Sequence, residues 1–169
     1  MNIYKILLIL SFQIWTTQTF AQNYKTAGGI RIGTEIGLTV QQFIQKHQTI
    51  EAMLTTSIQN KDVRFDVLWE DHYPMLGRRF NAYYGVGLHF ARPAEVNSSF
   101  VNQRGIVGVL GGELSVGKYV FSADIKPIVN LKAGTSQSYF EFMPGISARY
   151  IFIKRENMID RLERKLKNL

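Results

Sequence analysis

The chain has 169 residues, no cysteine and a formal net charge of +7 at pH 7. Without cysteine, a disulfide framework and a thiolate metal site are both excluded. The basic residues are scattered along the chain and do not gather in one segment, so the positive charge does not indicate a nucleic-acid partner. After removal of a leader, the length suits one domain.

The first 21 residues have the three parts of a secretory signal peptide. Met1–Lys5 is a short basic start, Ile6–Trp15 is mostly apolar, and Ala21 places a small residue at the expected cleavage point. The apolar run is shorter than the roughly 20 residues of a permanent transmembrane helix. A buried N-terminal strand or helix is the alternative. We expect residues 1–21 to be removed, so that the mature chain begins at Gln22.

Most of the mature chain alternates between apolar residues and polar or small residues. A period of two predicts β-strands with two unlike faces. Clusters of turn residues divide the pattern into eight predicted strands, at 24–32, 38–44, 49–58, 63–73, 80–90, 105–116, 119–131 and 139–152. Residues 27–42 could instead form one strand, which would leave seven. We prefer eight because an even number returns both termini to the same side.

The predicted connections differ in length between the two ends of the strands. The segments 45–48, 76–79 and 117–118 are short, whereas 132–138 is intermediate and Arg92–Arg104 is long and polar. With eight strands, the two longest segments fall on the same side. Short periplasmic turns and longer outer loops are typical of outer-membrane barrels. The short connections at 33–37 and 60–62 make this asymmetry partial.

One face of the predicted strands carries charges of both signs. Charged groups are rarely buried without partners, and an eight-stranded barrel is narrow enough for side chains to fill it. We therefore predict a salt-bridged interior that plugs the barrel. The predicted interior network contains four cations and six acids: Arg31, Glu51, Arg64, Asp66, Glu70, Glu113, Asp124, Lys126, Glu141 and Arg149.

The opposite face is apolar and is predicted to carry no charge between the strand ends. A water-soluble barrel needs charges on its outer face, so lipid is the better solvent for this surface. The predicted fold class is therefore all-β, a closed antiparallel eight-stranded transmembrane β-barrel. Pro127 and Pro144 interrupt two adjacent strands of this face. Because proline cannot donate to the ladder, we expect a shared bulge or early fraying there.

Residues with catalytic chemistry are few. His47, His72 and His89 lack metal-ligand spacing, and no Gly-x-Ser-x-Gly run is present. Glu70-Asp71-His72 could form an acid–base group, but a lone inward histidine is more often a hydrogen-bonded interior residue. We therefore predict no catalytic, cofactor-binding or metal-binding residues and no enzymatic activity.

Four runs resemble the small eight-stranded outer-membrane β-barrel proteins of diderm bacteria, which have the OmpA-type transmembrane architecture. They are Gly37–Ile44, Ala82–His89, Ala123–Asn130 and Gly145–Phe152. The resemblance implies an outer-membrane location, a monomer, and membrane lipid and the barrel assembly machinery as partners. It brings no catalytic residues. One departure concerns Phe152, the expected terminal aromatic, because seventeen residues follow it.

The sequence therefore predicts a signal peptide at 1–21, a barrel at 22–153 and a basic tail at 154–169. In the tail, an apolar stripe at helical spacing favours a short amphipathic helix, formed by Ile159, Leu162, Leu166 and Leu169. This helix could lie on the membrane or dock a partner, and a solvated end is the alternative. The predicted function is structural or surface-binding, with loop 92–104 contacting an extracellular ligand. A lipid-modifying barrel enzyme and a narrow channel are the alternatives.

Overall fold

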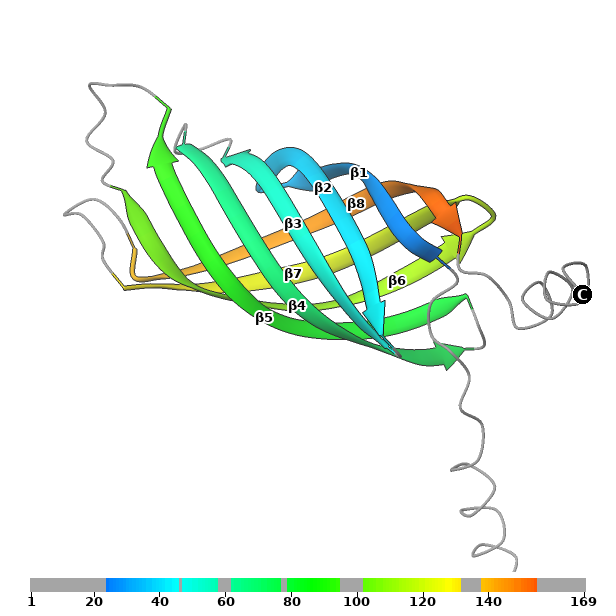
Figure 1. Cartoon of the computed structure of the whole chain (residues 1–169). Coiled ribbons are helices and arrows are strands. Elements are labelled where there is room, and N and C mark those ends of the chain that lie inside the picture. Colours follow the sequence, from blue (N-terminus) through cyan, green and yellow to red (C-terminus); the bar gives the residue numbers. More distant parts are fainter. Residues whose placement is uncertain are drawn as a thin grey trace, which may run out of the picture.

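The computed structural model describes residues 24–45, 47–57, 62–76, 79–94, 102–131 and 138–154. In these residues eight antiparallel strands form one closed barrel, in which each strand pairs with its neighbours in sequence and the last strand pairs with the first (Figure 1). The strands are β1 (Tyr24–Gly33), β2 (Glu35–Gln45), β3 (Gln48–Ser57), β4 (Asp62–Leu76), β5 (Phe80–Pro93), β6 (Gln103–Val116), β7 (Tyr119–Asn130) and β8 (Phe140–Lys154). The prediction of eight strands rather than seven is confirmed. Within the described residues, no helix is long and apolar enough to cross a membrane.

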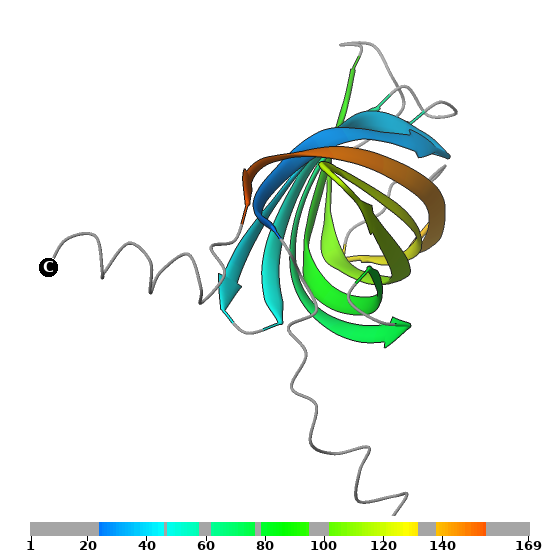
Figure 2. The ribbon, with the colours of Figure 1, turned by 90° about the vertical axis from the view of Figure 1, so that its right-hand side faces the viewer.

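The two ends of the barrel differ in their connections. Tyr24 and Lys154, the outermost residues of β1 and β8, pair with each other, so the described chain starts and stops at one end, here called the terminal end. The short connections β2–β3, β4–β5 and β6–β7 lie at this end, and the other connections lie at the opposite, loop end (Figures 1 and 2). The predicted signal peptide, and the tail beyond Lys154, lie outside the described residues.

Several predicted strand bounds are wrong, most clearly between β1 and β2. The segment 33–37 was predicted as a connection, but only Thr34 separates the two strands. Ile32 pairs with Ile36, and the pairing continues without interruption to Thr26 and Gln42. The glycines and polar residues resemble a turn, yet Glu35 lies in the strand with its carboxylate inside the barrel. The predicted loop 92–104 is likewise shorter, because Pro93 ends β5 and Gln103 begins β6.

The two prolines are accommodated without the predicted shared bulge. The register between β7 and β8 is continuous through both of them, with Ile125 opposite Pro144 and Pro127 opposite Phe142. On its other side, Pro127 leaves a gap in the β6–β7 pairing at the level of Gly108, and the same register resumes beyond the gap. A Cβ at Gly108 would lie 3.2 Å from the proline ring, so the glycine leaves space for it.

Glycine also allows close approach between strands. A Cβ at Gly87 would lie 1.9 Å from the carbonyl oxygen of Val67 on β4, which is far inside van der Waals contact. The two-residue turn between β6 and β7 needs glycine for another reason. Gly117 has φ of 64°, a left-handed conformation that costs other L-residues about 1–2 kcal/mol.

The barrel has a largely polar inside and an apolar outside. Its outer face exposes many large apolar side chains, such as Leu38 at 61% and Leu110 at 67%. Among the described residues the interior also contains two buried apolar clusters. One is formed by Met53, Leu68, Tyr83, Val107, Val109, Ile128 and Met143, and the other by Tyr24, Ala27, Val120 and Ile151. The prediction of an outer face without charges needs one correction. Asp71 is half-buried between the inward residues Glu70 and His72, and it pairs across the sheet with the exposed Tyr84.

Candidate functional site: the charged interior

All ten residues of the predicted interior network lie on the inner face. Nine are at most 6% exposed, and only Glu141, near the loop end, is half-buried. Two further acids, Glu35 and Asp62, are fully buried beside them. Both residues fall in segments that were predicted as connections, 33–37 and 60–62. The spacing of Asp62 could have identified it, because it lies two residues before Arg64 and therefore on the same side of β4. Glu35 begins β2, four residues after Arg31 of β1 and just beyond the turn at Thr34.

The layer nearest the loop end is centred on Arg64 of β4. Its Nε donates to Asp62 at 2.8 Å, and its Nη1 donates to Glu141 of β8 at 3.0 Å. Asn130 donates to the other oxygen of Glu141 at 2.9 Å. Since β4 and β8 lie on opposite sides of the barrel, this group of side chains crosses the lumen.

Lys126 of β7 organises the next layer. Its ammonium group is paired with Asp66 of β4 at 2.6 Å and with Glu35 of β2. Asp66 is also 2.6 Å from Nδ1 of His89. All four side chains are fully buried. Lys126 thereby links β7 to β2 and β4, two strands that are not hydrogen-bonded to β7.

Arg31 of β1 extends this layer. Its Nε donates to Glu35 at 2.9 Å and its Nη1 donates to Asp124 of β7 at 3.0 Å. The hydroxyl of Tyr83 donates to the same Asp124 carboxylate at 2.7 Å. Gly145 leaves room for the guanidinium, because a Cβ there would lie 2.7 Å from its Cζ.

Arg149 of β8 forms a third group, nearer the terminal end. It is 1% exposed and is paired with Glu51 of β3 across the lumen. It also donates to the hydroxyls of Ser122 at 2.9 Å and Thr39 at 3.2 Å. Each of the three guanidinium nitrogens thus contacts an oxygen of a different strand: Nε on β2, Nη1 on β7 and Nη2 on β3.

The terminal end contains two buried acids that no arginine or lysine of the described residues contacts. Glu113 accepts a hydrogen bond from Tyr24 at 2.8 Å and a longer one from Asn81 at 3.5 Å. Glu70 accepts from Gln41 at 2.7 Å and from Thr49 at 3.1 Å. In the described residues the ten predicted charged side chains therefore fall into four sets. Three are groups held by ion pairs, and the fourth consists of Glu70 and Glu113, which accept hydrogen bonds from neutral side chains.

Thr49, His72 and Glu70 converge in this region, which invites comparison with a nucleophile–base–acid triad. The hydroxyl of Thr49 lies 3.0 Å from Nε2 of His72, and Glu70 lies 3.3 Å from the same nitrogen. A triad needs the nucleophile and the acid on opposite ring nitrogens. Here no residue that the structure describes is hydrogen-bonded to Nδ1, and all three residues are fully buried. The geometry suits a structural hydrogen-bond cluster. No group of three or more metal-ligating side chains occurs in the described residues.

Comparison with known proteins identifies the architecture. No family model matches the chain, and no curated protein matches it either. Among solved structures, the N-terminal β-barrel domain of Pseudomonas aeruginosa OprF is similar, with a TM-score of 0.56 and 13% identity. The match covers 78% of this chain and 100% of the OprF domain. At this identity the similarity establishes the fold, which is the closed eight-stranded barrel.

Proposed function

We propose that this protein is a small, non-enzymatic outer-membrane β-barrel protein with a structural or surface-binding role. The observation that carries the proposal is the inverted distribution of side chains. Arg31, Arg64, Arg149 and Lys126 are among the largest fully buried side chains, while large aliphatic and aromatic residues cover the outside. In water this arrangement exposes apolar surface and buries charge, whereas a bilayer solvates the outside and the barrel satisfies its charges internally.

The length of the apolar outer face fits a bilayer. On β6, residues with side chains on this face run from Ile106 to Val116 without a charge, and Arg104 and Lys118 lie just beyond them. Ten residue steps extend about 33 Å along a strand. At a strand tilt of about 40°, they rise about 25 Å along the barrel axis, which is the usual height of the apolar band of such barrels.

Exposed aromatic residues near both ends of this face support the same proposal. Near the terminal end, the exposed rings of Tyr73 and Tyr84 stack at 5.8 Å, and Tyr119 meets Tyr150 edge to face at 5.6 Å. Phe140 and Phe142 form an edge-to-face pair near the loop end. Aromatic girdles at both interfaces are typical of transmembrane barrels.

The cross-lumen pairs favour an anchor over a channel. Arg64–Glu141, Lys126–Asp66 and Arg149–Glu51 each join strands that are not hydrogen-bonded neighbours. A cluster of buried apolar side chains also lies inside the barrel. In this proposal the barrel is a monomer in the outer membrane, assembled by the barrel machinery, and it presents the connection after Pro93 to ligands outside the cell.

Two experiments test this proposal. Mature protein made without its leader should be insoluble in buffer, fold in detergent or lipid and run as a heat-modifiable band on gels. A freely soluble monomer that needs no detergent would refute it. Planar-bilayer recordings should show no steady conductance, and lipid-A mass spectra of a deletion strain should be unchanged. Steady conductance would instead indicate a channel, and a defined acyl change would indicate an enzyme.

A further inference from the structure

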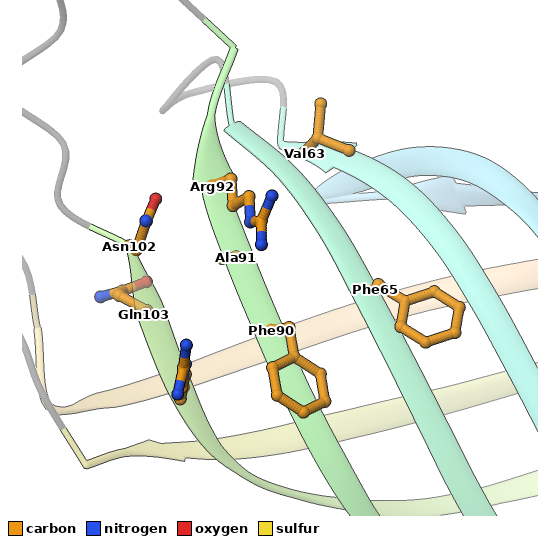
Figure 3. A pocket seen from close by; sticks show the side chains of 8 residues that line it. Val63, Phe65, Phe90, Ala91, Arg92, Asn102 and Gln103 are labelled. Atoms are coloured by element: carbon orange, nitrogen blue, oxygen red, sulfur yellow. The ribbon is translucent and has the colours of Figure 1, made fainter.

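A hollow on the outside of the barrel combines aromatic rings with two arginines. It lies on β4, β5 and β6 at the loop end and has a volume of about 420 Å³ (Figure 3). The outward side chains around it come from all three strands: Val63, Phe65, Phe90, Arg92, Asn102 and Arg104. Each of them is more than a third exposed. The hollow is therefore a surface feature, separate from the charged interior.

The strand register arranges these six side chains in two rows. Phe65 pairs with Phe90, and Phe90 pairs with Arg104, so these three form the lower row. Val63 pairs with Arg92, two residues closer to the loop end, and these two belong to the upper row. By the same register, Asn102 lies beside Arg92 and completes the upper row. Each arginine thus has an apolar side chain next to it on the same face.

The two guanidinium groups have no anionic partner within the described residues. Neither side chain makes an ion pair there, and no described acidic residue lines the hollow. Arg92 and Arg104 occupy diagonal positions on adjacent strands, a relationship that separates the backbones by about 7–8 Å. Long side chains at that separation can converge on one anion. Guanidinium groups bind phosphate oxygens well because their N–H groups form a planar fork.

The outer surface between the hollow and the middle of the barrel is apolar. The next outward row contains Val67, Leu88 and Ile106, which pair with one another across β4, β5 and β6. Leu88 is 56% exposed and Ile106 is 49% exposed. From the loop end inward there is therefore first a row with Arg92 and Asn102, then a row in which Arg104 lies beside Phe90, and then an aliphatic row. A phospholipid in a bilayer has the matching order of phosphate, glycerol backbone and acyl chain.

We propose that this hollow binds an anionic lipid, with Arg92, Arg104 and Asn102 holding its phosphate and with one acyl chain lying along Phe90 and Leu88. The site rests on the proposed function, because it requires a membrane whose surface meets the barrel at this level. A free phosphate ion would use the arginines but would leave the aromatic and aliphatic rows unused. Those rows favour the lipid as the occupant, and arginine stems readily lie along apolar surface while the charged group reaches the interface.

The test uses mature protein inserted into nanodiscs of phosphatidylcholine with increasing phosphatidic acid, and it counts bound phosphatidic acid by native mass spectrometry. The variant Arg92→Gln/Arg104→Gln removes both cations from the hollow. The control Lys25→Gln/Lys118→Gln removes the same charge from exposed positions at the terminal end. We expect the first variant to bind phosphatidic acid about 30-fold more weakly, which corresponds to about 2 kcal/mol for two basic residues near a membrane surface. The control should stay within about twofold of the wild type.

Three results would overturn the lipid site. The two variants could lose equal affinity, which would indicate a general charge effect. Inorganic phosphate could compete as well as phosphatidic acid, which would indicate a site for a free anion. Phe90→Ser could leave the preference for phosphatidic acid over glycerol phosphate unchanged, which would exclude the acyl contact. Insertion into nanodiscs is measured first, so a wild-type protein that fails to insert refutes the proposed membrane function itself.

Discussion

Replacing Arg149 with alanine tests whether the cross-lumen pairs hold the barrel together. Arg149 is 1% exposed, and its guanidinium contacts Glu51, Ser122 and Thr39. Without it, the fully buried carboxylate of Glu51 keeps only the hydroxyl of Thr39 as a hydrogen-bond donor among these groups. Removing one member of a buried ion pair costs about 3–5 kcal/mol. We therefore expect Arg149→Ala to lower the free energy of unfolding by about 4 kcal/mol.

The assay is urea unfolding in neutral phosphatidylcholine vesicles, followed by fluorescence of Trp69, the only tryptophan after residue 22. With a slope of about 2 kcal/mol per molar urea, 4 kcal/mol shifts the midpoint by about 2 M. Arg64→Ala should also cost about 3–5 kcal/mol, because it leaves the fully buried Asp62 without its cation, while its second partner Glu141 is 13% exposed. Arg92→Ala, an exposed change, should stay within about 0.5 kcal/mol of the wild type.

A double variant distinguishes the cost of leaving the Glu51 carboxylate unpaired from the cost of losing the volume of the Arg149 side chain. In Arg149→Ala/Glu51→Gln the carboxylate left without its cation is neutral, so the double variant should recover at least about 1 kcal/mol relative to Arg149→Ala. If Arg149→Ala, Arg64→Ala and Arg92→Ala unfold at the same midpoint, these arginines do not hold buried ion pairs. Equal midpoints for Arg149→Ala and the double variant would assign the loss to packing rather than to charge.

Three further predictions concern single positions. Gly87→Ala should prevent barrel formation on vesicles or destabilise it by about 3 kcal/mol or more, because its Cβ would overlap the Val67 carbonyl. The control Gly112→Ala should still fold, because the nearest atom to its Cβ is in the Phe80 ring at 3.3 Å, and gel mobility distinguishes the two outcomes. Gly117→Ala should cost about 1–2 kcal/mol in urea unfolding from backbone strain alone, since nothing lies within 4 Å of the added Cβ. Tyr24→Phe should cost about 1–3 kcal/mol in the same assay, because it removes a donor from the buried Glu113.

The alternation in the sequence was sufficient to predict the two faces of the strands, because side chains of a strand point to opposite sides with a period of two. Leu38 and Arg64 illustrate this, since the first is 61% exposed outside and the second is fully buried inside. Turn composition was less reliable. Glu35 and Asp62 follow glycine- or asparagine-containing segments that resemble turns, yet both residues belong to strands and contribute to the interior.

The partners of the interior charges could not be predicted from the sequence. Which side chains meet across a lumen depends on the stagger of the strands around the barrel, and this stagger is a property of the closed sheet. Arg149 meets Glu51, 98 positions away, although Glu70 and Glu113 also face the interior. Those two acids receive neutral donors instead. Charge counting predicted an excess of acids, but it did not predict where the excess would lie.

The placement of the ion pairs explains how a chain of this length can close its sheet. Closure requires β1 to pair with β8, and this contact joins the two most distant segments of the barrel, at a cost in loop-closure entropy. Three of the buried ion pairs bridge across this junction: Arg31 of β1 with Asp124 of β7, Lys126 of β7 with Glu35 of β2, and Arg149 of β8 with Glu51 of β3. Each pair is satisfied only when β1 and β8 are together, because an opened sheet would separate its members. The interior charges thus favour the closed barrel over an open sheet. They do so at the β1–β8 contact, which joins the first strand to the last.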